Sequence, residues 1–378
     1  MRGAMVRSRY EWRVPDSGPA NPGASVCTRS VLRTPHSGHR NPKGVALIMV
    51  LWMIAILSVI VLEFSFAMRT EVTIAMNFKD ETQLYAIAEA GIQRAVAELI
   101  YKHDARTQQL RKPKTTATAT EELPPEQQEW VTDGRAYLVP FGEKEGEVRI
   151  MAEAGKVNIN TVSEATLRKI VGQLGLEEDK RDIVVDSILD WRDPDDLYRV
   201  NGAENDYYQS LKEPYKAKNA NLDTIEELLL VRGVTPELFY GKRGTKEGEE
   251  TKGGGGALKD VFSVYAPGEQ VDLNSASLPV LRIVLGLPLE VAQQIVKARA
   301  EKPFQHQQDL LQRVPELSTF MGQIVGVAVF RSTAAYYTLE SSGKIKGRKS
   351  ARGVKAIVKI DPSEKQGYKV IQWVDALF

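Results

Sequence analysis

The sequence predicts an α+β fold in which a long N-terminal α-helix precedes an antiparallel β-sheet, with an α-helical domain inserted between the strands. Three patterns support this prediction. Helical periodicity runs without a break from an apolar segment into an amphipathic one, strand-like alternation occurs near residues 135–150 and again after residue 354, and the region between them repeats a helical motif.

Residues 1–44 form a basic leader that has no apolar periodicity. They carry eight Arg or Lys side chains against only Glu11 and Asp16, and they are rich in Pro, Gly and Ser. The whole chain nevertheless has a formal net charge of only +1, which argues against a generally basic nucleic-acid binder. The single cysteine, Cys27, lies in this leader, so the rest of the chain cannot form an internal disulfide.

The segment Val45–Leu62 is an uncharged apolar run of 18 residues. A helix of this length roughly spans the hydrocarbon core of a bilayer. Because basic residues precede it, the positive-inside rule leaves the leader in the cytoplasm and exports the rest of the chain. A cleaved secretory signal and a plain single-span anchor are the simpler alternatives. The sequence Glu63-Phe64-Ser65-Phe66 follows the run, in place of the small residues of a signal cleavage site.

The helical pattern continues beyond the apolar run. No Pro or Gly occurs after the run until Gly91, and apolar residues recur at helical spacing as far as Ile100. One helix from about Val45 to Tyr101 would be on the order of 85 Å long. Its first part, residues 45–65, is apolar all round and suits a transmembrane or filament-core helix, whereas residues 66–105 are an amphipathic continuation.

Two strand-forming regions flank the middle of the chain. Residues 106–130 form a polar linker, rich in Thr, Lys, Pro and Glu, with too few apolar side chains to pack. Apolar alternation then predicts strands within residues 131–156 and again within residues 326–378, where a turn separates two further alternating stretches. We expect these regions to belong to one sheet.

Residues 157–325 are predicted to form the inserted α-helical domain. The stretch VNINTVSEATLRKIVGQLG near Val157 is echoed by VDLNSASLPVLRIVLGLP near Val271, and each copy has an Asn-Thr or Asn-Ser N-cap before a helix. A short helical unit, NLDTIEELLLVRGVTPELF, lies between them, and Gly253–Gly256 is a flexible connection. The repeats resemble helix-hairpin-helix modules, which implies a helix-hairpin-helix or SAM-like domain.

The turn of the second repeat bears on nucleic-acid binding. Helix-hairpin-helix modules contact phosphates through backbone N–H groups of a Gly-hydrophobic-Gly turn. Here the first glycine is Gly286, but Pro288 and Leu289 stand where the second glycine is needed, and proline has no N–H. We therefore expect packing or protein contact from this domain, and no nucleic acid as a partner.

The stretch DWRDPDDLYRVNGAENDYY, from Asp190 to Tyr208, is the strongest candidate for a site. It is an oxygen-rich loop of the kind that hard cations prefer, although its spacing is not that of an EF-hand. Crowded carboxylates repel one another unless they are neutralised, and a domain without thiols would gain stability from a cation. A solvated acidic loop is the alternative. The candidate metal ligands are Asp190, Asp193, Asp195, Asp196, Glu204 and Asp206.

Catalytic motifs are lacking in the sequence. It contains no GxSxG, HExxH, phosphate loop or dinucleotide fingerprint. Of the four histidines, His36 and His39 belong to the leader, while His103 and His306 stand alone. The sequence therefore predicts a protein that is not an enzyme.

Lys43-Gly44 directly before the apolar run resembles the N-terminus of type IV pilins and type II secretion pseudopilins. In these families a prepilin peptidase cuts after the glycine, which implies cleavage between Gly44 and Val45, N-methylation of Val45 and a pilin-like helix and sheet. Most members have Glu at the fifth mature position, where this chain has Met49. That Glu is thought to neutralise the terminal amine of a neighbouring subunit, so its absence suits a subunit at the filament tip.

The sequence NGAENDYY within the acidic stretch is similar to a signature of the K-type minor pseudopilins of type II secretion, and the likeness covers nearly the whole chain after the leader. It implies calcium bound by the acidic residues as a group. It also implies a single-pass inner-membrane protein with a periplasmic C-terminal domain, located at the pseudopilus tip, where it initiates assembly and supports secretion across the outer membrane. The implied partners are I- and J-type minor pseudopilins, the major pseudopilin, the prepilin peptidase and the inner-membrane secretion platform.

Two alternatives remain at this point. A membrane-anchored DNA receptor of competence type would use the helix-hairpin-helix repeats, and the turn at Gly286-Leu287-Pro288 counts against it. A minor pilin of a type IV pilus would share the same kind of N-terminus.

Overall fold

The structure is a computed structural model that describes residues 43–104, 130–142, 144–241, 256–331, 333–345 and 351–376. Most of the predicted leader, most of the predicted linker and nearly all of the Gly253–Gly256 run lie outside the described residues. The chain divides into two units, Met1–Thr70 and Glu71–Phe378. Helix α1 (Lys43–His103) begins in the first and ends in the second, which confirms the long N-terminal helix.

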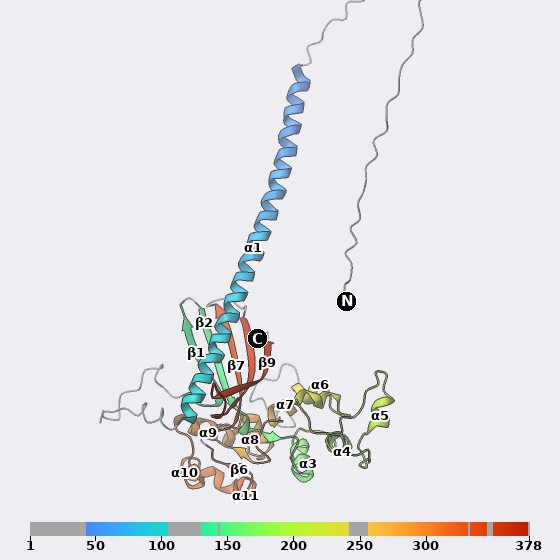
Figure 1. The fold of residues 1–378 in the computed structure, drawn as a ribbon, viewed down its shortest axis with the longest axis vertical. Coiled ribbons are helices and arrows are strands. Elements are labelled where there is room, and N and C mark those ends of the chain that lie inside the picture. Colours follow the sequence, from blue (N-terminus) through green and yellow to red (C-terminus); the bar gives the residue numbers. More distant parts are fainter. Residues whose placement is uncertain are drawn as a thin grey trace, which may run out of the picture. The chain divides into compact units, whose positions relative to one another are not determined.

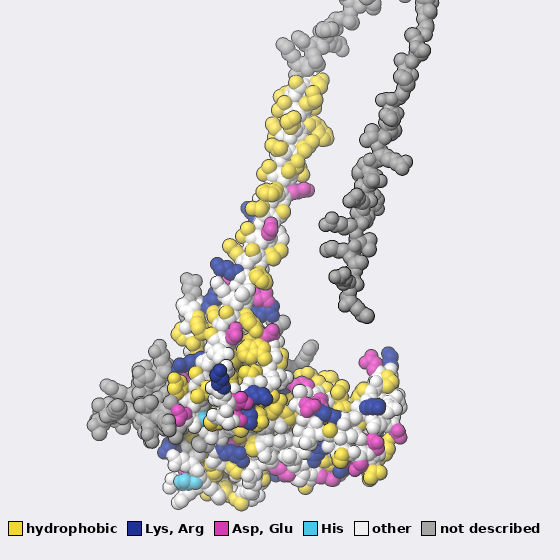
Figure 2. Space-filling view, in the orientation of Figure 1, with side chains coloured by type: hydrophobic (Ala, Val, Ile, Leu, Met, Phe, Trp, Pro, Cys, Tyr) yellow, Lys and Arg dark blue, Asp and Glu magenta, His cyan; other side chains and the backbone are white. Residues whose placement is uncertain are grey.

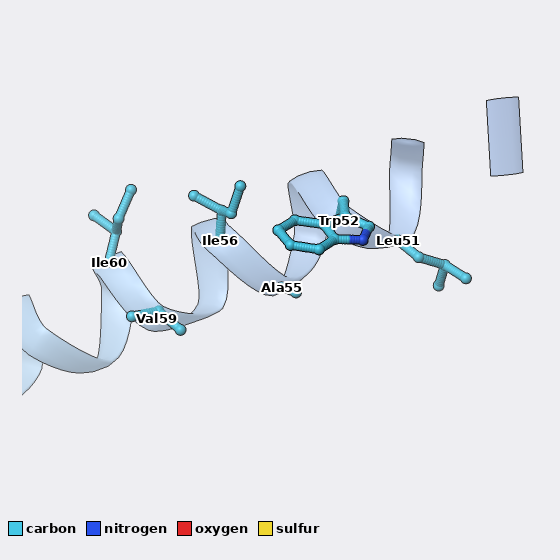
Figure 3. Close-up of a pocket in the computed structure, with 6 residues that line it drawn as sticks. All are labelled: Leu51, Trp52, Ala55, Ile56, Val59 and Ile60. Carbon is cyan, nitrogen blue, oxygen red and sulfur yellow. The ribbon is translucent and has the colours of Figure 1, made fainter. Parts of the chain in front are cut away.

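The apolar part of α1 exposes its side chains on every turn. It contains a segment that is long and apolar enough to cross a membrane, and none of that segment is buried within the protein. Figure 2 shows hydrophobic side chains along it. In the close-up of Figure 3, large side chains surround the small Ala55 and line a shallow apolar depression: Leu51, Trp52, Ile56, Val59 and Ile60. Such a surface is stable where lipid or another apolar helix replaces water.

Five antiparallel strands form the sheet of the second unit, in the order β1-β2-β7-β8-β9 (Figure 1). The strands are β1 (Asp133–Phe141), β2 (Lys144–Ala152), β7 (Tyr336–Ile345), β8 (Ala351–Ile360) and β9 (Tyr368–Ala376). Strand β2 pairs with β7 although almost two hundred residues separate them in sequence, with Val148 opposite Ser341. The helical domain therefore leaves the sheet after β2 and returns at β7, as an insertion between strands.

The C-terminal part of α1 packs on this sheet. One face of the helix is buried against the apolar side chains of β2, β7 and β8. The helix contributes Ala88, Ile92, Ala95, Val96 and Leu99, and the sheet contributes Val148, Ile150, Leu339, Val354, Ala356 and Val358. Trp130, the last residue of the predicted linker, is also buried and stacks on Tyr137 with ring centroids 4.5 Å apart, so the packed region begins at that residue.

Gly343 on β7 allows the helix to approach the sheet closely. A Cβ atom at this position would clash with the carbonyl oxygen of Leu84. We predict that Gly343→Ala destabilises the protein by about 1–3 kcal/mol, because the helix must move away from the sheet. Urea denaturation of the full chain in detergent measures this loss. Gly322→Ala is the control, since nothing lies within 4 Å of its added Cβ, and an equal loss in both variants would contradict the prediction.

The inserted domain consists of short helices and two small parallel ladders, in which β3 pairs with β4 and β5 pairs with β6. Its core is a separate cluster of buried apolar side chains. The elements are η2 (Glu153–Gly155), β3 (Val157–Asn158), α3 (Glu164–Gly172), α4 (Glu178–Arg192), α5 (Asn205–Gln209), η3 (Ile225–Leu230), α6 (Pro236–Tyr240), α7 (Leu258–Val261), β4 (Phe262–Ser263), β5 (Val271–Asp272), α8 (Leu278–Ile283), α9 (Leu289–Glu301), α10 (Gln307–Arg313), η4 (Pro315–Phe320), α11 (Met321–Ile324) and β6 (Ala328–Val329). Strand β6 lies within the range predicted for the second part of the sheet but pairs inside the helical domain.

The two copies of the predicted internal repeat make equivalent hydrogen bonds. The amide of Asn160 donates to the carbonyl of Leu222 and accepts from its N–H, at 2.9 and 2.8 Å. Asn274, at the matching position of the second copy, makes the same pair of bonds with Phe304, at 2.9 and 2.7 Å. The asparagine of each repeat therefore joins its turn to a distant segment, in addition to preceding a helix.

An arginine completes each repeat. Arg192 of α4 donates to the carbonyls of Ile159 and Val162 at 2.5 and 2.6 Å. In the second copy, Arg299 of α9 donates to the carbonyls of the matching residues, Leu273 and Ala276, at 2.8 and 2.5 Å. These guanidinium groups satisfy carbonyls that the tight turn before each first helix leaves without a partner.

Arg299 also links the helical domain to the sheet. It is 2% exposed, and its Nε lies 4.0 Å from a carboxylate oxygen of Asp133 on β1. Arg135 donates to the same carboxylate at 2.7 Å. Burial acts to raise the pKa of Asp133, but hydrogen bonds from Arg135 and the nearby guanidinium charges outweigh it, so this pKa lies below its ordinary value. Asp133 is therefore held ionised between the two domains.

Glu269 fixes the start of α3 from the neighbouring repeat. Its carboxylate accepts from the N–H of Ser163 at 2.6 Å and from the hydroxyl of Thr166 at 2.7 Å. Burial acts to raise the pKa of Glu269, but these hydrogen bonds outweigh burial and lower it. Ser163 is the N-cap residue of α3, and Glu269 adds an acceptor and a negative charge at the helix start from a distant part of the sequence.

We predict that Glu269→Gln lowers the free energy of unfolding at neutral pH by about 1 kcal/mol. Because the folded-state pKa is depressed, the carboxylate stabilises the protein above the ordinary glutamate pKa and loses this effect as the pH falls through the depressed value. The difference between wild type and variant should therefore shrink toward about pH 3. Urea titrations at both pH values measure it, and a difference that is independent of pH would count against the prediction.

Candidate functional site

The acidic stretch forms the end of α4, the following loop and the start of α5. Asp190 lies in the last turns of α4 and Asp193 follows its end, while Glu204 directly precedes α5. Asp195 and Asp196 lie in the loop between the helices. The sixth predicted ligand, Asp206, is on the exposed side of α5. The fold therefore gathers the predicted residues in one region, in different environments.

Arg199 lies between two of the predicted ligands. Its Nη1 donates to Asp190 at 2.9 Å and to Asp193 at 2.6 Å, and its backbone N–H contacts the second oxygen of Asp190 at 3.3 Å. Burial raises the pKa of Asp190, and Arg199 offsets part of that rise. The guanidinium group thus supplies the counter-charge for two carboxylates in this structure.

Glu204 is the least satisfied charged group of the site. Its side chain is 1% exposed, and both carboxylate oxygens lack a hydrogen-bond partner. Burial, followed by the charges of Asp190 and Asp193, raises its pKa to about 7. Two further buried oxygens of the region, Oδ1 of Asp193 and Oδ1 of Asn219, also have no partner. A buried acceptor without a donor is costly, so a cationic or donor group bound to these oxygens would stabilise the region.

The two loop carboxylates make local structural hydrogen bonds. Asp195 accepts from the N–H of Leu197 at 2.9 Å. Asp196 accepts from the side-chain amides of Asn205 and Asn219, at 2.6 and 2.9 Å. Among the residues that the structure describes, no three acidic or histidine side chains are arranged as a preformed metal cage.

Two residues of this region were not predicted. Asp186 is buried and accepts from the backbone N–H of Asn201 at 3.1 Å and from Arg168 at 3.0 Å, so it fixes the far end of the loop. Its position one helical turn before Asp190 is a signal that the sequence does contain. Asn219 has a positive φ of 46° and reaches the loop from a distant segment, which no local pattern indicates.

The donor set fits a hard cation. Calcium prefers carboxylate and amide oxygens and tolerates irregular geometry. The unpartnered oxygens belong to Glu204, Asp193 and Asn219, which are donors of this kind. These residues would hold the ion, which would supply the positive charge that Glu204 lacks.

The hairpin between α8 and α9 presents no phosphate-binding turn. Gly286 has a positive φ of 67°, as the turn requires, but the next N–H, that of Leu287, donates to Leu281 at 3.3 Å. Pro288 has no N–H. Residues 267–320 contain five Lys or Arg and six Asp or Glu, and Arg299 among them is buried. Both the geometry and the charge disfavour contact with a nucleic-acid backbone.

The predicted cleavage site lies at the start of α1. The helix begins at Lys43, so Gly44 and Val45 are in its first turn. Val45 and Met49 are both exposed on the helix surface.

Comparison with known families gives two matches. Residues 148–241, which run from β2 through the acidic loop to α6, match the family model for type II secretion system (T2SS), protein K. Residues 267–320 match the helix-hairpin-helix motif. The chain is similar to the type II secretion system protein K of Pseudomonas aeruginosa, with 24% identity over 77% of this chain and 84% of that protein.

The chain therefore resembles protein K of type II secretion systems, in the matched family domain and in relatives that carry that name. The protein K of Pectobacterium carotovorum is 30% identical over 30% of this chain, and the matched part spans only 38% of that protein. A protein K of Aeromonas hydrophila is 24% identical over 53% of this chain and 61% of its own length. The predicted resemblance to protein K is therefore confirmed.

The solved structure of the GspK-GspI-GspJ complex from the enterotoxigenic Escherichia coli type 2 secretion system contains a chain with a similar fold. The match has a TM-score of 0.50 at 15% identity and covers 80% of this chain and 99% of that one. At this identity the likeness concerns the fold, and it confirms the predicted combination of long helix, antiparallel sheet and helical domain.

Proposed function

We propose that this protein is the minor pseudopilin at the tip of the type II secretion pseudopilus, where it initiates assembly and supports secretion of proteins across the outer membrane. The observation that carries the proposal is the large helical domain inserted between β2 and β7 of a sheet that packs on α1. Such a domain would obstruct the stacking of another subunit beyond it. Met49 is consistent with a position at the tip. A terminal subunit has no subunit beyond it whose N-terminal amine a glutamate at this position would neutralise.

The proposed partners are I- and J-type minor pseudopilins, by analogy with the proteins named in the similar complex. In the second unit, α1 exposes large apolar side chains at Val72, Ile74 and Phe78. Exposed apolar residues at this density favour contact with other helices over contact with water. The major pseudopilin and the inner-membrane platform would meet the apolar part of the same helix.

Co-purification of the full chain with its I- and J-type counterparts in detergent tests this proposal. Phe78→Glu, combined with Ile74→Glu, should abolish the association because it places charges in an apolar contact. Lys79→Glu changes a neighbouring exposed charge and serves as the control. Absence of association in the wild type would overturn the partner assignment, and intact secretion after deletion of the gene would overturn the function.

We further propose that the leader stays in the cytoplasm, that α1 crosses the inner membrane once and that the second unit lies in the periplasm. The prepilin peptidase would cut between Gly44 and Val45, and Val45 would then be N-methylated. Mass spectrometry of the mature N-terminus tests both steps. Any other N-terminal residue, or an unmodified Val45, would contradict them.

Calcium binding by the acidic loop is also a proposal. It is supported by the unpartnered oxygens of Glu204, Asp193 and Asn219. The remaining predicted ligands of the acidic group are Asp190, Asp195, Asp196 and Asp206. The ion would fix the loop and thereby stabilise a domain that has no cysteine.

A membrane-anchored DNA receptor is the rival function that the helix-hairpin-helix match suggests. The use of the Leu287 N–H within the turn and the slightly acidic charge of residues 267–320 argue against it. A duplex-binding titration in increasing salt would decide between the two, since phosphate contacts give affinity that falls steeply with salt.

A further inference from the structure

The loop between α4 and α5 exposes three large apolar side chains within four positions. Leu197 is 74% exposed, Tyr198 is 53% exposed and Val200 is 97% exposed. Single exposed apolar residues are common on protein surfaces, but a group of them on one loop indicates a contact surface. The loop and α5 lie at the end of the helical domain away from the sheet (Figure 1).

This loop is held in place from within, so the exposure follows from its fixed backbone. Between the two aliphatic residues, Arg199 turns inward to Asp190 and Asp193, at 2.9 and 2.6 Å. On the far side, the backbone N–H of Asn201 donates to Asp186 at 3.1 Å. Leu197 and Val200 therefore point outward.

Acidic groups surround the apolar residues. Asp195, Asp196 and Asp206 are exposed on the loop and on α5, whereas the one basic residue of the loop, Arg199, is already paired with two carboxylates. A surface of this charge repels phosphates, whether of nucleic acids or of anionic lipids. It complements a protein recess that is apolar at its centre and carries Lys or Arg at its rim.

The edges of the sheet are poorer candidates for docking. Edge strand β1 contains Pro140, which cannot donate to a further strand. Edge strand β9 contains a register shift opposite Ile357 and Val358. Both features oppose the addition of another strand.

We propose that residues 194–200 form a docking loop, in which Leu197 and Val200 insert into an apolar recess bordered by Lys or Arg on another protein of the secretion pathway. The proposal rests on the proposed function, because it assigns the loop a contact beyond the I- and J-type partners. The contact is made by the side of the domain that carries the acidic loop and leaves α1 and the sheet free.

A random peptide library displayed on phage tests the chemistry of the partner. Phage that bind the Leu197→Ser/Val200→Ser variant are first removed. The remaining phage are then selected for binding to the full chain in detergent and calcium. Peptides with a central apolar pair flanked by Lys or Arg are the expected outcome. Recovery of peptides without basic residues, or of none that distinguish the variant, would overturn the proposal. Binding of the wild type, but not of the variant, to vesicles of anionic phospholipid would overturn it in favour of a membrane contact.

Secretion in the parent bacterium provides the second readout. The double variant should lower the amount of secreted protein several-fold while still co-purifying with the I- and J-type subunits. Val325→Ser, which changes another exposed aliphatic residue of the same domain, should have no effect. Unchanged secretion in the double variant would reject the docking loop alone, whereas unchanged secretion after deletion of the whole gene would reject the proposed function.

Discussion

Replacing Arg299 with alanine is expected to lower the free energy of unfolding by about 3–5 kcal/mol. The substitution leaves the carbonyls of Leu273 and Ala276 without their donor. It also removes a guanidinium charge from the buried carboxylate of Asp133. Removal of one partner of a buried ionic network is costly because the remaining charge and acceptors stay out of water.

Urea denaturation of the full chain in detergent measures this effect. Arg299→Lys keeps the charge but lacks the planar guanidinium group whose Nη1 donates to both carbonyls, so it should fall between alanine and wild type. Lys297→Ala removes an exposed charge from the same helix and should have almost no effect. If Arg299→Ala were as stable as Lys297→Ala, the network would not hold the sheet and the helical domain together.

Calcium is expected to raise the melting temperature of the protein. A ligand that binds only the folded state at one hundred times its dissociation constant stabilises that state by about 2.7 kcal/mol. Thermal unfolding in millimolar calcium and in chelator measures the shift. Magnesium should give a smaller one, because it demands stricter octahedral geometry. Identical melting curves in calcium and chelator would exclude the site.

Glu204→Gln tests calcium binding separately from the stability of the fold. The variant should lose most of the calcium-dependent shift, because it removes the buried carboxylate whose oxygens have no partner. In chelator it should be more stable than the wild type, since it takes an uncompensated charge out of a buried position. Glu213→Gln changes an exposed acid of the same domain and should behave as the wild type does. A variant that kept the full shift would show that the ion binds elsewhere.

The sequence was sufficient for features that depend on neighbouring residues. The uninterrupted helical pattern after Val45 predicted α1, and the two copies at Val157 and Val271 predicted a repeated helical unit. Strand β7 was missed because its sequence, YYTLESSGKI, alternates weakly and contains two serines and a glycine. It forms a strand because it lies between β2 and β8, where it is buried and pairs with a strand on each side.

For the acidic loop, too, the sequence indicated the local pattern and the tertiary structure decided the environment of each residue. The cluster of carboxylates was evident from spacing alone, but their environments were not. Arg199 lies between Asp190 and Asp193, while Glu204 is buried without any partner. Asn219 joins the loop from a separate segment, through a backbone conformation that its neighbours in sequence do not indicate.

By itself, the sequence determined the membrane-length helix, the α+β class, the duplicated helical unit and the acidic group, because periodicity, capping residues and charge density are local properties of the chain. Only the tertiary structure decided which carboxylate lacks a counter-charge, which arginine joins the two domains and which apolar side chains remain in water. These outcomes depend on burial and on contacts between distant segments, since the same side chain is stable or costly according to the groups that surround it.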